Sequence, residues 1–176
     1  MNLRFVTAGD PADVEPRAFM RWPVGASIPV IAAQARREVA ALPSTQILYL
    51  DVPSAGVDVR HAWQVMEAVG RANIRLAWPA DTFEPPSLVV PTLNLRIGLL
   101  RVTKLDERAK DYVRRLAGVG SSAYVVIDPP AGEDRIADAH AAMTALHAIV
   151  APPKPAKSGR PAFKTGHSDA APAGGG

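Results

Sequence analysis

Two aspartates in similar surroundings are the main candidates in this sequence for a functional site. Asp51 ends one apolar run and precedes a Pro-Ser-Ala-Gly turn one residue later, whereas Asp128 ends another and is followed directly by Pro-Pro-Ala-Gly. Each turn leads, after one further residue, to a second aspartate, Asp58 or Asp134. The carboxyl ends of parallel strands form the edge where α/β proteins bind ligands. Carboxylates at that edge could therefore contact a bound ligand.

The candidate ligand site consists of both aspartates and the polar or small residues of their turns. It comprises Asp51, Ser54, Gly56, Asp128 and Gly132. If the two strands are neighbours, Asp51 and Asp128 face one crevice and could hold Mg²⁺, which prefers oxygen ligands. If they are not, each carboxylate serves as a turn acceptor for backbone N–H groups. We favour the turn role, so no cofactor is expected and Mg²⁺ is the alternative.

The repeated turn also has a purely structural explanation. Proline stops a strand, glycine lets the chain reverse sharply, and an aspartate before a helix accepts hydrogen bonds from its first N–H groups. We therefore expect Asp58 and Asp134 to cap the helices that follow them.

The stretch Ile-Leu-Tyr-Leu-Asp-Val-Pro-Ser-Ala-Gly-Val-Asp, residues 47–58, resembles the Walker B strand and D-loop of ABC-type ATPases. The resemblance implies that Asp51 is the magnesium-side aspartate and Asp58 the D-loop aspartate. Val52 stands where that family has its catalytic glutamate, and no Gly-x-x-x-x-Gly-Lys-Ser/Thr loop occurs in the chain. The residues thus predict a nucleotide-binding-like fold that lacks a phosphate loop.

The same stretch is similar to the strand and helix of Clp-type serine peptidases, in which a nucleophilic serine begins a later helix. The corresponding region here, 78–83, contains no serine, and no histidine lies between His61 and His140. An acyl-transfer site needs a nucleophile with a base in reach, so the sequence does not supply one. His140 and His147 lie about 10 Å apart along one predicted helix, too far to share a metal ion.

Alternating apolar strands and amphipathic helices must position the two aspartates. Strands are predicted at 3–7, 46–50, 74–78, 88–90, 93–97 and 123–127. Helices are predicted at 28–42, at 59–72, from a cap at Thr103 or Asp106 to about 117, and at 135–150. Residues 12–26 have no sustained period and are expected to be irregular, while the alternation around Pro91 predicts an antiparallel edge at 88–97. We predict one three-layer α/β domain, residues 1–150, with a mostly parallel sheet of about five strands and helices on both faces.

The last segment, residues 151–176, holds the whole excess of positive charge. Its basic residues are Lys154, Lys157, Arg160 and Lys164. With Asp169 they give +3, which equals the formal charge of the 176-residue chain, so the body is neutral. The Pro-, Ala- and Gly-rich composition predicts a disordered tail, whose basic side chains could contact nucleic-acid phosphates.

Composition narrows the classes of function. The absence of cysteine excludes disulfides and thiolate metal sites. No run approaches the roughly 18–20 apolar residues of a membrane span, and residues 1–7 lack the apolar region of a signal peptide. We expect a cytoplasmic, non-catalytic binding, scaffolding or accessory protein of a bacterial complex, with a protein partner and no membrane contact. The alternatives are a nucleic-acid-associated factor using the tail and a Mg²⁺- or phosphate-dependent enzyme using Asp51 and Asp128.

Overall fold

The computed structural model describes residues 2–8, 17–70, 73–80, 91–129, 131–132, 134–151 and 174. Its strands are β1 (Asn2–Thr7), β2 (Ala18–Arg21), β3 (Leu48–Asp51), β4 (Ile74–Pro79), β5 (Ile97–Val102) and β6 (Ser122–Ile127). Its helices are α1 (Ile28–Ala40), α2 (Val59–Val69), α3 (Glu107–Gly118), α4 (Arg135–Val150) and the short 3-10 helix η1 (Pro91–Arg96). The strands form one sheet in the order β1-β6-β5-β4-β3-β2, with every neighbouring pair parallel. The predicted α/β fold with a parallel sheet is confirmed, with six strands instead of about five.

Strand β3 shows why the first aspartate stands where it does. Leu48, Tyr49 and Leu50 are all buried, as expected for a strand in the interior of a parallel sheet, and the run ends at Asp51. The chain then leaves the sheet through the Pro-Ser-Ala-Gly turn. Gly56 has a φ of 82°, a left-handed conformation that glycine adopts without strain.

Strand β2 lies inside the segment 12–26 that was predicted to be irregular, so that prediction is wrong for residues 18–21. The strand has four residues, of which only Met20 is buried. Such a short, mostly exposed edge strand carries no periodic signal.

Strand β5 corrects the predicted antiparallel edge at 88–97. It begins at Ile97, runs parallel between β4 and β6, and is buried over most of its length. Residues 91–96 form η1, in which Leu93 is buried and Leu95 exposed, so a helical turn produced the alternation that had indicated a strand. Residues 88–90, predicted to be a strand, lie outside the described part of the chain.

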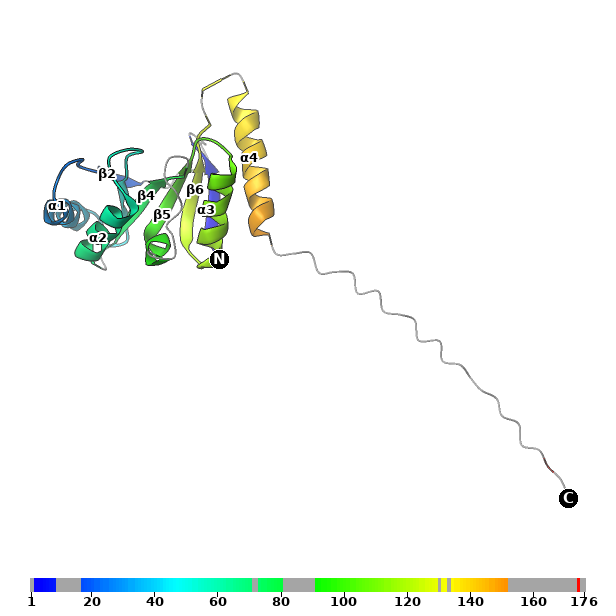
Figure 1. Ribbon diagram of the computed structural model, residues 1–176, viewed down its shortest axis with the longest axis horizontal. Helices are drawn as coiled ribbons and strands as arrows, with labels where there is room; N and C mark the ends of the chain where they lie inside the picture. The colour runs from blue at the N-terminus through cyan, green and yellow to red at the C-terminus, as the bar shows by residue number, and fades with distance from the viewer. Residues whose placement is uncertain are drawn as a thin grey trace.

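All four α-helices pack on one face of the sheet. Their buried residues share one hydrophobic cluster with alternate strand residues such as Leu50, Leu76 and Val125. Trp78 of β4 donates a buried hydrogen bond to the hydroxyl of Tyr112 in α3, at 2.7 Å. Figure 1 shows α1 and α2 together at one end of the sheet and α3 and α4 together at the other. In the described ranges this arrangement differs from the predicted one, which had helices on both faces.

The opposite face of the sheet carries a second, smaller cluster, and we call it the concave face. The cluster comprises Tyr49, Ala77, Leu99, Tyr124 and Val126, and none of the described helices contributes to it. The guanidinium of Arg17, just before β2, lies 4.4 Å from the ring centre of Tyr124 on β6. Four strand spacings separate β2 from β6, about 19 Å in a flat sheet, which is too far for these side chains to meet. The sheet must therefore curve toward this face.

No helix in the described ranges is both long and apolar enough to cross a membrane.

Close packing on the concave face depends on Gly98 in β5. The register between β4 and β5 shifts at this point, because Leu76 pairs with Ile97 and the next residue of β4 pairs with Leu99. A Cβ atom at Gly98 would lie 2.7 Å from the Cβ of Arg75, closer than real Cβ contacts. Glycine is therefore required here by the approach of a neighbouring strand.

We predict that Gly98→Ala lowers the free energy of unfolding by about 1–3 kcal/mol, because overpacking forces neighbouring strands to shift. Urea unfolding followed by circular dichroism measures this change. Gly118→Ala is the matched control, since nothing lies within 4 Å of a Cβ there and alanine favours the helix. An unfolding free energy for Gly98→Ala equal to that of the unmodified chain would contradict the close approach.

Candidate functional site

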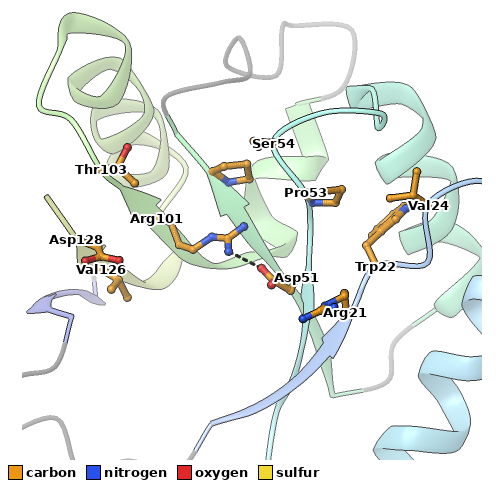
Figure 2. Close-up of a pocket in the computed structure, with 11 residues that line it drawn as sticks. Arg21, Trp22, Val24, Asp51, Pro53, Ser54, Arg101, Thr103, Val126 and Asp128 are labelled. Carbon is orange, nitrogen blue, oxygen red and sulfur yellow. Dashed lines mark ion pairs between the residues drawn. The ribbon is translucent and has the colours of Figure 1, made fainter. Parts of the chain in front are cut away.

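The carboxyl ends of five strands surround a pocket of about 590 Å³, which we call the strand-end pocket. Its polar lining residues are Arg21, Asp51, Ser54, Arg101, Thr103 and Asp128. Its apolar lining residues are Trp22, Val24, Pro53, Pro79 and Val126. Figure 2 shows these side chains around the ends of the strands. Three of the five residues of the predicted ligand site, Asp51, Ser54 and Asp128, therefore lie around one pocket.

The alternation of side chains along each strand directs the charged groups of the pocket to the concave face. Asp51 follows Leu50, which points into the helical layer, so the Asp51 carboxylate lies on the opposite side. Leu100 and Val102 belong to the hydrophobic cluster that the helices cover. Arg101 lies between them on β5, so its side chain projects to the opposite, concave face. The pairing of strands then decides which of these groups can meet.

Asp51 and Arg101 form an ion pair across the intervening strand β4. The Arg101 Nη1 lies 2.6 Å from the Asp51 Oδ1, and each side chain is 35% exposed. The angle of this contact is not that of a hydrogen bond, so we describe it as a charge contact. The Nη2 of Arg101 donates a hydrogen bond to the carbonyl of Val52, at 2.7 Å. Arg101 is therefore held at two points, and the charge of Asp51 is compensated.

Asp128 is paired with a different arginine. Its carboxylate accepts a hydrogen bond from Arg135, the first residue of α4. Its backbone N–H donates to the carbonyl of Val102 on β5, at 2.9 Å, and this bond extends the sheet by one residue. The pairing therefore ties the end of β6 to the start of the last helix.

The two aspartates line one pocket, but their strands are not neighbours. Strands β5 and β4 stand between β6 and β3, which separates the backbones of Asp51 and Asp128 by about 14 Å along the sheet. A shared Mg²⁺ site required neighbouring strands, so the strand order does not support it. Within the described ranges, no group of three or more His, Cys, Asp or Glu residues could hold a metal ion. In the same ranges the partners of both carboxylates are arginines, not the backbone N–H groups of the turns.

The structure places the remaining predicted site residues in different positions relative to the strand-end pocket. Ser54 lines the strand-end pocket. Gly56 does not line it but forms the turn beside it, where a Cβ would lie 3.4 Å from Val24. Gly132 is exposed and lies outside the lining. The predicted nucleic-acid contacts of the tail, Lys154, Lys157, Arg160 and Lys164, lie outside the described residues.

Sequence reasoning missed the arginines and the tryptophan of the pocket. Arg21 and Trp22 come from the overlooked strand β2 and the residue after it. Arg101 could have been found, because it is a lone charge in the otherwise apolar run 97–102. Trp22 is almost fully buried, and the ring of His61 in α2 stands behind it with ring centres 5.9 Å apart.

The two predicted helix caps differ. The Asp58 side chain accepts a hydrogen bond from the backbone N–H of His61, at 2.6 Å, so this prediction is confirmed. Asp134 makes no such bond, and the prediction that it caps α4 is wrong. Its backbone, with φ −95° and ψ 10°, lacks the extended conformation that Asp58 adopts and that a cap normally requires. The repeated motif therefore folds differently at its two occurrences.

Comparison of the chain with models of protein families, with curated proteins and with solved structures finds no match.

The difference between the two caps leads to a direct prediction. Asp58→Ala should lower the free energy of unfolding by about 1 kcal/mol, because it leaves an N–H of α2 without its acceptor. Asp134→Ala, the matched control, should change it by less than about 0.5 kcal/mol. Chemical unfolding of both variants measures these values. Equal losses in the two variants would show that the two turns cap their helices alike.

A double-mutant cycle of Asp51→Asn and Arg101→Gln measures the ion pair of the pocket. Because both side chains are about one third exposed, we expect a coupling free energy below about 1 kcal/mol that decreases as salt is added. A coupling of several kcal/mol that does not depend on salt would instead indicate a buried pair.

Proposed function

We propose that this chain is a non-catalytic binding protein whose strand-end pocket holds a small molecule. The observation that carries the proposal is the convergence of side chains from five strands on one pocket at the carboxyl edge of a parallel sheet. Ligands of open α/β sheets bind at this edge. The pocket volume of about 590 Å³ also lies within the range typical of small-molecule sites.

The chemistry of the lining supports an organic ligand. Small-molecule sites combine apolar walls with a few placed polar groups. Here Trp22 and Val126 contribute apolar surface, and Ser54 and Thr103 contribute hydroxyl groups. A ligand with both apolar and polar parts would match this lining.

The pairing of charges supports binding in preference to catalysis. Asp51 and Asp128 each contact an arginine. A serine or threonine nucleophile needs a base within hydrogen-bond reach, and the described lining residues include no histidine. The ring of His61 packs against that of Trp22, with ring centres 5.9 Å apart, and His61 is not among these lining residues. These features suit a preformed receptor surface.

Fluorescence titration with N-phenyl-1-naphthylamine, an uncharged dye that brightens in apolar surroundings, tests the proposal. We expect saturable binding to the full chain. Ser54→Trp should weaken it by about tenfold or more, equivalent to about 1.4 kcal/mol, because the new ring fills the pocket from an exposed turn. Ser44→Trp, in an exposed turn before β3 and outside the lining, is the matched control and should bind as the unmodified chain does.

Two results would overturn the proposal. One is the absence of saturable dye binding to the unmodified chain. The other is equal affinity in Ser54→Trp and Ser44→Trp, which would place the bound dye elsewhere on the molecule. Circular dichroism of each variant shows whether it is folded before it is titrated.

A further inference from the structure

We infer that the ligand of the strand-end pocket is an amphiphilic anion, a small apolar body bearing one acidic group, and that Arg21 selects it. This inference rests on the proposed binding function and names its ligand class. It follows from the charges that line the pocket, from the place of Arg21 in the sheet and from the apolar walls beside it.

The part of the lining that the structure describes has four charged side chains, and three of them already have a charged partner. Asp51 contacts Arg101, and Asp128 contacts Arg135. Arg21 forms no hydrogen bond or ion pair with any side chain in the described ranges. With three arginines and two aspartates, the described charged residues of the pocket and their partner Arg135 sum to a net charge of +1. Among these residues, the charge without a charged partner is that of Arg21.

The sheet places the Arg21 side chain on the side of the pocket. Arg21 ends β2 and is the register partner of Asp51 on β3, so both side chains leave the sheet on the same face. The backbone N–H of Trp22 donates to the Asp51 carbonyl, at 3.2 Å, which holds the end of β2 against β3. Figure 2 shows Arg21 beside Asp51, whose carboxylate is directed toward Arg101.

The existing ion pair explains why Arg21 remains available. Asp51 is its neighbour, yet no ion pair joins them in the described structure, because the Asp51 carboxylate contacts Arg101 on the other side. A guanidinium presents parallel N–H donors that match a carboxylate or phosphate at two points. Arg21 can therefore bind an incoming acidic group without breaking an existing contact.

The remaining walls define the rest of the ligand. Trp22 and Val24 lie within three residues after Arg21 in the chain, and Pro53 and Val126 contribute further apolar surface. A purely inorganic anion would leave this surface unused, whereas a neutral apolar molecule would leave the charge of Arg21 unmatched. An acidic group on an aromatic or aliphatic body satisfies both.

Paired titrations with two dyes test this inference. 8-Anilinonaphthalene-1-sulfonate carries one acidic group on the same ring system as the neutral N-phenyl-1-naphthylamine. Arg21→Gln should weaken sulfonate-dye binding about five- to tenfold, the loss expected for a partly exposed charge-assisted contact. It should leave neutral-dye binding unchanged. Arg21→Lys, which keeps the charge but not the two-point geometry, should lie between the unmodified chain and Arg21→Gln.

The matched control is Arg37→Gln, which removes the same charge from an exposed position on α1 outside the lining. It should leave the affinity for both dyes unchanged, which separates a local contact from the effect of net charge. Added salt should weaken the sulfonate dye only.

The outcomes separate this inference from the function on which it rests. If the unmodified chain binds both dyes equally well and Arg21→Gln changes neither affinity, anion selection by Arg21 is overturned while the binding function stands. If the unmodified chain binds neither dye, both are overturned. Equal weakening by Arg21→Gln and Arg37→Gln would also overturn the role of Arg21.

Discussion

The parallel direction of all six strands determines where the helices, the curved face and the pocket lie. From β2 to β6 each strand is laid beside the previous one in the same direction, and crossovers between parallel strands are right-handed. The helices that connect these strands, α1, α2 and α3, consequently collect on one face. The other face has none of the described helices to cover it, so it buries Tyr49, Ala77 and Leu99 by curving, and Gly98 permits the close approach this needs. Curvature also brings the ends of β2 and β6 around one pocket.

Charged and polar contacts have different roles at the two faces. On the helical face, the buried hydrogen bond between Trp78 and Tyr112 joins the sheet to α3 and satisfies an indole N–H that would otherwise be costly to bury. At the strand ends, the side chains of Asp51 and Arg101 are each about one third exposed, so the contribution of their contact to stability is small. Its larger effect is geometric, because it holds the Asp51 carboxylate against Arg101, and no ion pair joins Asp51 to Arg21 in the described ranges.

The parts of the fold that could be predicted are those in which one local signal is strong. The continuous apolar run before Asp51 indicated a buried strand, and Asp58 before an amphipathic stretch indicated a helix start. The missed strand β2 is short and mostly exposed, and β5 was obscured by the misleading alternation of η1 just before it. The ion pair at Arg101 depends on strand order, which no local pattern encodes. Likewise, similar sequences at Asp58 and Asp134 hid a difference in backbone conformation.

The place of β1 has a consequence for the order of assembly. Strand β1 comes first in the chain, yet it pairs with β6, and the contact of Arg4 with Tyr124 spans 120 residues. The ring of Phe5 in β1 also packs against that of His147 in α4, with ring centres 4.3 Å apart. During synthesis the ribosome adds β1 to the chain long before β6 and α4, so β1 is unpaired until these two elements have been made. Contacts so distant in sequence form slowly, so we expect β1 to be among the last strands to join the sheet.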